Sequence, residues 1–272
     1  KINPTDQVVA ADLMNLNQTE KAVENSEIVY FTAGLPMDSE LWESDFLIMV
    51  DHIIKACQKS KSKLVFFDNT YMYPKDDTPQ YEETDFLPVG RKSTIRAKMA
   101  QLVLDEIENG TLEAVICRAP EFYGPKRTQS ITNKLVLDKI KNHLTANIPL
   151  NKETLRTLIW TPDASRAMAL IGNTPSAYGQ TWHLPCDEPQ TYSDILAISE
   201  GVVNGTLKAK VTPLWQFKLL KPFNKYVREL DELLPRYGKD NIFVSDKFKH
   251  AFPDFKVTTL EKGISIVLAE EK

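Results

Sequence analysis

Short apolar runs alternate with long amphipathic segments through the first half of this chain, and this alternation restricts its fold more than any other feature. Residues 28–33, 64–67 and 114–117 are nearly continuous apolar runs of strand length, as expected of parallel strands covered on both faces. Residues 41–60 and 94–109 repeat apolar side chains every three or four positions, which predicts helices. We therefore predict an α/β fold with a doubly wound parallel sheet.

The second half of the chain continues the alternation less regularly. Its elements are shorter and polar loops separate them, which indicates a smaller C-terminal lobe attached to the main sheet. The further elements that the pattern predicts are strands at 8–11 and 178–184 and helices at 131–143, 161–171 and roughly 214–234.

The composition is ordinary for a globular protein. The chain is 42% hydrophobic and 26% charged, and its net charge of -4 gives no reason to expect nucleic-acid or anionic-membrane binding. The three cysteines and four histidines are scattered without a CxxC pair, so neither a disulfide framework nor a metal site is expected. No stretch approaches the ~18 apolar residues of a membrane span, and no secretory signal is visible, so we expect a cytoplasmic protein.

The stretch from Asp68 to Lys98 has the order of a known active site. A predicted strand ends at Asp68-Asn69, a polar loop containing Tyr73 follows, and the next helix carries Thr94 and Lys98 one turn apart. The motif is completed by Arg118-Ala119-Pro120-Glu121 and Tyr123-Gly124-Pro125. This order resembles the extended short-chain dehydrogenase/reductase family, which contains the NAD-dependent epimerases and dehydratases and has a Rossmann-like sheet.

The resemblance implies a catalytic triad in which two of three residues are replaced. Asn69 stands at the family's Ser/Thr position and Thr94 at the position of the catalytic tyrosine, while Lys98 keeps the lysine. In the family this lysine lowers the pKa of the tyrosine and holds the nicotinamide ribose. Asn69 can still donate a hydrogen bond to a carbonyl oxygen, but the Thr94 hydroxyl is far less acidic than a phenol. By itself Lys98 resembles a surface lysine; the flanking motifs favour a cofactor role.

The resemblance also implies contacts with NAD or NADP. Asp12 matches an aspartate that accepts a hydrogen bond from the adenine amino group, although it also fits a carboxylate that caps a turn. Gly34 belongs to a small-residue segment that follows a strand and lies beneath the cofactor. The expected cofactor-binding residues are Asp12, Leu13, Thr32, Ala33, Gly34, Lys98, Arg118 and Pro120.

No glycine-rich phosphate-binding turn such as G-x-x-G-x-x-G occurs in the 272 residues. In the family such a turn, with its strand and helix, precedes the segment matched by Asp12-Leu13. The resemblance therefore predicts a strand, a glycine-rich turn and a helix ahead of Lys1, about 45 residues in all, since a β-α-β unit takes at least ~30. Residues 1–125 would form the dinucleotide-binding domain, and residues 126–272 mostly the substrate lobe, interleaved with the first.

Two functions remain open from the sequence. The first is an NAD(P)-binding epimerase/dehydratase-like or reductase-like oxidoreductase acting on a small carbonyl or nucleotide-sugar-type substrate. The second is a catalytically inactive protein that senses NAD(P) or a metabolite and acts through a partner. Tyr71 and Tyr81 are the first candidates to supply, from another position, the phenol that is missing at Thr94. In homodimers of the family, the helices that often pair are those at 41–60 and 94–109. A basic group on the second helix, which resembles a phosphate-binding patch or a solvated helix face, comprises Arg91, Lys92, Arg96 and Lys98.

Overall fold

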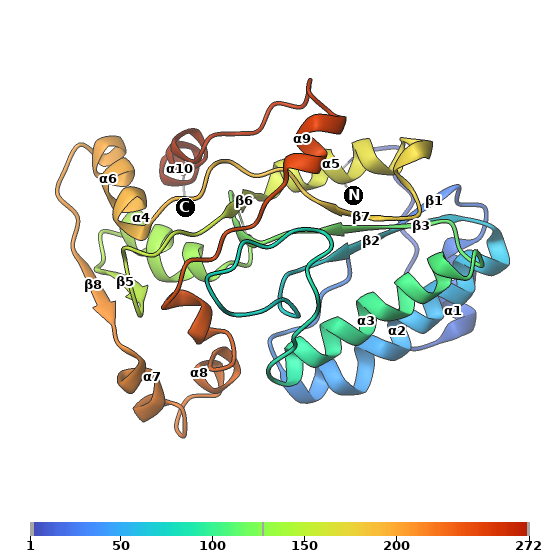
Figure 1. Ribbon diagram of the computed structural model, residues 1–272, viewed down its shortest axis with the longest axis horizontal. Helices are drawn as coiled ribbons and strands as arrows, with labels where there is room; N and C mark the ends of the chain where they lie inside the picture. The colour runs from blue at the N-terminus through green and yellow to red at the C-terminus, as the bar shows by residue number, and fades with distance from the viewer. Residues whose placement is uncertain (1–2, 127, 271–272) are drawn as a thin grey trace.

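A parallel sheet lies at the centre of the computed structural model, which describes residues 3–126 and 128–270 (Figure 1). Within that part of the chain the sheet has four strands in the order β1-β2-β3-β7. They are β1 (Ile28–Phe31), β2 (Lys63–Asp68), β3 (Ala114–Arg118) and β7 (Thr181–His183). Val29 pairs with Leu64, and Leu64 pairs with Ala114, all in parallel. The predicted α/β fold with a doubly wound parallel sheet is confirmed.

Helices cover both faces of this sheet. On one face lie α1 (Leu16–Val23), α2 (Ser39–Ser60) and α3 (Arg91–Glu108), and on the other lie α5 (Thr161–Gly172) and α9 (Asp246–Ala251) (Figure 1). Successive residues of β2 point to opposite faces, so Leu64 and Phe66 pack with α2 whereas Val65 packs with α5. This explains why residues 64–67 of the strand are all apolar.

The C-terminal lobe gathers the remaining elements around a separate core cluster. Its two small parallel sheets pair β4 with β6 and β5 with β8. The elements are β4 (Glu121–Tyr123), a π-helical turn η1 (Asn133–Leu137), α4 (Asp138–Lys141), β5 (Ala146–Pro149), β6 (Leu158–Trp160), α6 (Tyr192–Val203), β8 (Ala209–Thr212) and α10 (Leu260–Ala269). The 3₁₀ turn η2 (Pro175–Ala177) follows α5, and its Ala177 packs in the core of the central sheet. Because β7 follows this lobe's first elements and joins the central sheet, the two halves of the chain interleave.

Two predicted elements differ in the structure. Residues 8–11 form no strand, and Val8 and Val9 are exposed. The helix expected over 214–234 is divided into α7 (Leu214–Leu220), α8 (Lys225–Leu230) and the 3₁₀ turn η3 (Leu234–Tyr237). Pro222 has no N–H to donate to the helix, and the Asn224 side chain accepts from the Val227 N–H at 3.2 Å and begins α8. The apolar periodicity continues across this break, which is why the prediction joined the pieces.

Candidate functional site

A cavity opens at the carboxyl ends of the central strands. Gly34 follows β1, Asn69 follows β2 and Pro120 follows β3, and all three line the cavity. The opposite wall comes from the segment after α8, which contributes Leu233 and Arg236. The volume is about 540 Å³. Ligands of open parallel α/β sheets bind at this edge, because the strand ends and helix N-termini converge there.

Arg96 of α3 supplies a buried cation on the sheet side of the cavity. Its side chain is held between the rings of Trp42, 5.0 Å away, and Phe46, 4.8 Å away, and is 9% exposed. Its nearest carboxylate is that of Asp68, at 4.0 Å. Burial lowers the pKa of Arg96 and Asp68 opposes this, but a guanidinium stays charged. The Nε of Arg96 is buried and has no hydrogen-bond partner among the described residues, while the side chain as a whole lines the cavity.

Arg236 of η3 is a second buried cation on the opposite wall. Its Nη2 donates to the carbonyl oxygen of Thr70 at 3.1 Å and to the Thr70 hydroxyl at 3.2 Å. It is 6% exposed, and its Nε also lacks a partner within the described part of the chain. An unsatisfied buried N–H group costs free energy unless it binds something. Both guanidinium groups line the cavity, and two cations there suit a ligand that carries acceptor oxygens.

Tyr71 lies between these two arginines. Its ring stacks on Trp42 with centroids 6.1 Å apart, and the Arg236 guanidinium lies 5.7 Å from the ring centre. The Tyr71 N–H donates to the Asn69 side chain at 2.9 Å, which fixes the turn after β2. Burial raises the pKa of Tyr71, opposed by Arg236 and Arg96, so the phenol stays protonated at neutral pH. A protonated phenol at this place is a hydrogen-bond and proton donor.

A buried polar network lies beneath the cavity and holds its floor. The Nε of Arg118 donates to Asp68 at 3.1 Å, and its Nη1 donates to the Tyr73 hydroxyl at 2.5 Å. Burial lowers the pKa of His183 to about 3, so the ring is neutral; its Nδ1–H donates to the Val244 carbonyl. The Tyr73 hydroxyl therefore donates to the His183 Nε2, at 2.8 Å. These side chains fix the turn between β2 and Tyr71 and are themselves sealed from the cavity.

The predicted catalytic residues are only partly brought together. Asn69 lines the cavity, and its predicted role remains a proposal. Thr94 does not line it: its hydroxyl donates to the Gly90 carbonyl at 2.9 Å, one turn back along α3. Lys98 is exposed on α3 and also lies outside the cavity wall. The structure therefore turns a different face of α3 toward the site, the face that carries Arg96.

Some of the predicted cofactor-binding residues line the cavity, and others lie outside its wall. Gly34 and Pro120 line the cavity; Thr32 is exposed beside it, and Ala33 packs against the core. Asp12 lies outside the cavity wall, and its carboxylate accepts the Met14 N–H at 2.9 Å, as in the turn-capping alternative. The two others have structural contacts: Leu13 packs with the core cluster of α2, and Arg118 lies in the network beneath the floor.

Two residues of the cavity, Arg96 and Arg236, have no separate role in the sequence-based prediction, whereas Tyr71 is one of its two candidates for a displaced phenol. Arg96 was visible only as a member of the basic group on α3. The one signal for Arg96 in the sequence is its spacing: it follows Lys92 by four residues, just as Lys98 follows Thr94, so either pair can share one face of the helix. Arg236 is far from the motif in sequence and gave no signal.

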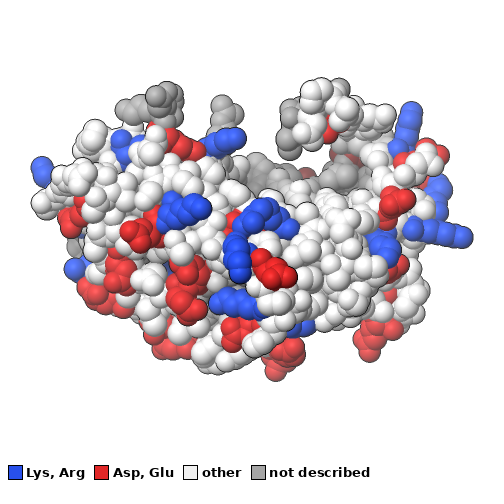
Figure 2. Space-filling model, turned by 90° about the horizontal axis from the view of Figure 1, so that it is seen from above, with Lys and Arg blue, Asp and Glu red and all other residues white. Residues whose placement is uncertain are grey.

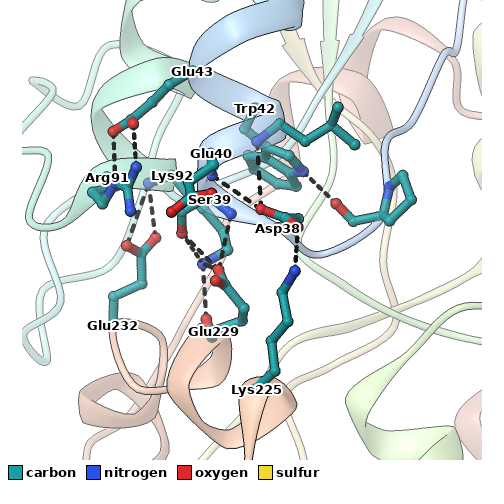
Figure 3. Close-up of polar contacts among 12 residues, drawn as sticks. Asp38, Ser39, Glu40, Trp42, Glu43, Arg91, Lys92, Lys225, Glu229 and Glu232 are labelled. Carbon is teal, nitrogen blue, oxygen red and sulfur yellow. Dashed lines mark hydrogen bonds and ion pairs between the residues drawn. The ribbon is translucent and has the colours of Figure 1, made fainter.

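The wall that carries Arg236 is held in place by two carboxylates of the 225–232 segment (Figure 3). Glu229 accepts from the Ser39 N–H at 3.0 Å, at the N-terminus of α2, and pairs with the Lys92 ammonium at 2.7 Å. Glu232 accepts from the Lys92 N–H at 3.1 Å, at the N-terminus of α3. The α3 N-cap is Gly90, and a Cβ there would collide with the Glu232 side chain. The two carboxylates thus cap both helices from outside and oppose their positive dipole ends.

Comparison with known proteins agrees with this geometry. Residues 1–184 match the NAD dependent epimerase/dehydratase family, and the chain belongs to that family. Comparison with curated proteins gave no match.

Solved structures of similar fold include three enzymes whose names refer to nucleotide sugars. UDP-glucuronic acid 4-epimerase from Bacillus cereus, in complex with UDP-glucuronic acid and NAD, is 16% identical with a TM-score of 0.78, covering 98% of this chain and 82% of that one. UDP-glucose 4-epimerase from Thermus thermophilus, in complex with NAD, is 14% identical with a TM-score of 0.75, covering 98% and 85%. dTDP-glucose 4,6-dehydratase from Bacillus anthracis, in complex with NAD, is 14% identical with a TM-score of 0.75, covering 98% and 80%.

Proposed function

We propose that this protein binds NAD or NADP at the carboxyl edge of its sheet and acts on a small carbonyl or nucleotide-sugar-type substrate in the adjoining cavity. The observation that carries the proposal is the pair of buried arginines, Arg96 and Arg236, which both line the cavity and bring two guanidinium cations to it. Family membership and the cofactors and substrates named for the similar structures support it.

The residues at the strand ends fit the ribose and nicotinamide part of the cofactor. A Cβ added at Gly34 would meet nothing within 4 Å, so the backbone there is open to a flat ligand. Asn69, Pro120 and Arg96 complete this side of the cavity, where the Asn69 amide and the Arg96 guanidinium can donate to ribose hydroxyls and amide oxygens. The glycine-rich turn that cradles the pyrophosphate in related folds is not part of the 272-residue sequence. A bound nicotinamide supplies hydride transfer.

The chain's own side chains would bind the substrate and move a proton. Arg236 is placed to bind an anionic group of the substrate, because a guanidinium pairs readily with phosphate or carboxylate oxygens. Tyr71 would donate its phenolic proton to the substrate oxygen, taking the place of the tyrosine that α3 lacks. Trp42 stacks on Tyr71 and limits its rotation.

Cofactor titration of two matched variants tests the site. Arg96→Met should weaken binding of the preferred cofactor roughly five- to hundredfold, the effect of losing a charged hydrogen bond of about 1–3 kcal/mol. Lys98→Met changes a cation two positions away on the same helix but outside the cavity, and should leave affinity unchanged. Calorimetry with NAD and with NADP measures both. If Lys98→Met weakens binding and Arg96→Met does not, the cofactor is not held as we propose.

The alternative function is a catalytically inactive protein that binds the cofactor or a metabolite and acts through a partner. The observation in its favour is that α3 contains no tyrosine, so the proton donor typical of the family is missing from its usual helix. Cofactor binding without turnover on a panel of carbonyl compounds and nucleotide sugars would support this alternative. Turnover that disappears in Tyr71→Phe would exclude it.

A further inference from the structure

Exposed apolar side chains concentrate in one short segment of this protein. Of the eighteen large hydrophobic residues that are exposed in the described part of the chain, seven lie between positions 203 and 223. They are Val203, Val211, Leu214, Trp215, Leu219, Leu220 and Phe223. Val203 ends α6, and the other six lie on β8, on α7 and in the following turn. Single exposed hydrophobic residues are common, whereas a group of six within thirteen positions marks an interaction surface.

The orientation of α7 separates its buried side from its exposed side. Phe217 packs in a cluster with Leu230 and Leu233 and attaches the helix to the protein. Trp215 and Leu219 lie one turn apart on another side and are 62% and 64% exposed. Phe223, in the turn after the helix, is 87% exposed. This turn lies at the lower extremity of the molecule in Figure 1, where a flat surface can reach it.

The same segment is strongly basic. Residues 201–228 contain six basic residues and no acidic one, in a chain whose net charge is -4. On the face shown in Figure 2, by contrast, basic and acidic residues are interspersed. Lys221 and Lys225 pair with Asp231 and Asp38. The other basic residues near the exposed hydrophobic ones, Lys208, Lys210 and Lys218, are exposed and have no ion pair with a described residue.

We propose that residues 208–223, which we call the basic apolar edge, bind the surface of a bilayer that contains anionic lipids. Trp215, Leu219 and Phe223 would enter the interface between headgroups and acyl chains, and the lysines would pair with lipid phosphates and carboxylates. None of the helices in residues 3–126 and 128–270 has the length and apolar character of a membrane span. The net charge alone had predicted no such attraction, because it averages this segment with acidic surface elsewhere.

A bilayer fits this edge better than a second copy of the chain does. A twofold dimer pairs a surface patch with itself. Lys208, Lys210 and Lys218, which form no ion pair with a described residue, would then face the same lysines of the other copy. An anionic membrane offers the opposite charge together with an apolar layer a few ångströms deeper.

Co-sedimentation of the protein with vesicles tests the proposal. We expect binding to vesicles of phosphatidylcholine mixed with phosphatidylserine, weaker binding to phosphatidylcholine alone, and release at high salt. Lys208→Gln, Lys210→Gln and Lys218→Gln combined should weaken binding roughly a hundredfold, about fivefold per lysine at low salt. The pair Trp215→Ala and Phe223→Ser should weaken it at least about tenfold. Leu87→Ser, at an exposed apolar residue outside the edge, is the matched control and should bind as wild type does.

Tryptophan fluorescence gives a second readout that does not depend on the variants. Trp42, Trp160 and Trp182 are each 6% exposed, so Trp215 is the exposed one of the four. Its emission should shift to shorter wavelength on adding phosphatidylserine vesicles and should be quenched by brominated lipid. The proposal is overturned if the wild type does not sediment, if the variants bind equally well, or if the emission does not change. A dimer that forms without lipid and is lost in the Trp215 and Phe223 variant would assign the edge to a second copy instead.

Discussion

Glu229→Gln tests whether the carboxylate caps outside α2 and α3 stabilise the fold. The change keeps the shape of the side chain and removes its charge. Lys92, which is 1% exposed, then loses the carboxylate at 2.7 Å and is left as a buried, uncompensated ammonium (Figure 3). Breaking a buried ion pair by removing one partner costs about 3–5 kcal/mol.

The lower end of that range applies here. The Lys92 ammonium keeps hydrogen bonds to the Ser39 hydroxyl at 2.9 Å and to the Glu229 carbonyl at 2.8 Å, and the glutamine oxygen can still accept from the Ser39 N–H. We therefore expect a loss of about 3 kcal/mol in the free energy of unfolding. For a chain of this size that lowers the melting temperature by roughly 6–12 °C. Thermal melts followed by circular dichroism, with urea titrations, measure both quantities.

A neighbouring ion pair supplies the control. Glu43 pairs with Arg91 on the exposed side of the same cluster, and exposed pairs contribute little (Figure 3). Glu43→Gln should therefore melt close to wild type. Adding Lys92→Met to Glu229→Gln removes the unpaired ammonium and should restore much of the lost stability. If Glu229→Gln and Glu43→Gln melt alike, or if Lys92→Met deepens the loss, the buried carboxylate does not stabilise the protein in this way.

Three further predictions follow from other parts of the molecule. Burial raises the pKa of Glu229, but the hydrogen bonds from Lys92 and Ser39 outweigh burial and bring the pKa below its ordinary 4.5. The Glu229 carboxylate therefore contributes its full stabilisation above pH 4.5, and this stabilisation is lost as the pH falls through the pKa of the folded state. The difference in melting temperature between wild type and Glu229→Gln should accordingly shrink in acid. Gly263→Ala places a Cβ against the Tyr123 ring and should lower the free energy of unfolding by about 1–3 kcal/mol in urea titrations. Gly201→Ala in α6 meets no atom within 4 Å and should raise the free energy of unfolding by about 0.5–1 kcal/mol. A more stable Gly263→Ala than Gly201→Ala would contradict the packing. If the protein turns over a substrate, Tyr71→Phe should lower kcat about 10²–10⁴-fold with cofactor affinity retained, and unchanged kcat would assign the proton donor to another residue.

The order of the central elements could be predicted from the sequence, because local chemistry fixes it. Strands covered on both faces must be apolar throughout, and helices covered on one face must repeat apolar residues every three or four positions. The runs at 28–33, 64–67 and 114–117 became β1, β2 and β3 with shifts of one or two residues at their ends. The break between α7 and α8 was missed, because Pro222 interrupts the hydrogen bonding of a helix without interrupting its apolar pattern.

The position of the candidate site was also determined by the sequence, but its residues were not. Parallel strands end at one edge, so Gly34, Asn69 and Pro120 had to lie near one another. Strand order does not determine which side of α3 faces these strand ends. Thr94 with Lys98 and Lys92 with Arg96 have the same four-residue spacing, and a shift of two positions turns a helix by about 200°.

Only packing in three dimensions could choose between these faces of α3. The apolar stripe of α3 docks against the sheet and α2, which directs Arg96 toward the rings of Trp42 and Phe46 and leaves Lys98 in solvent. The far wall is likewise tertiary, since Glu229 reaches Ser39 across 190 positions of sequence. No local pattern encodes such a contact, because its free energy arises only when both segments are already folded.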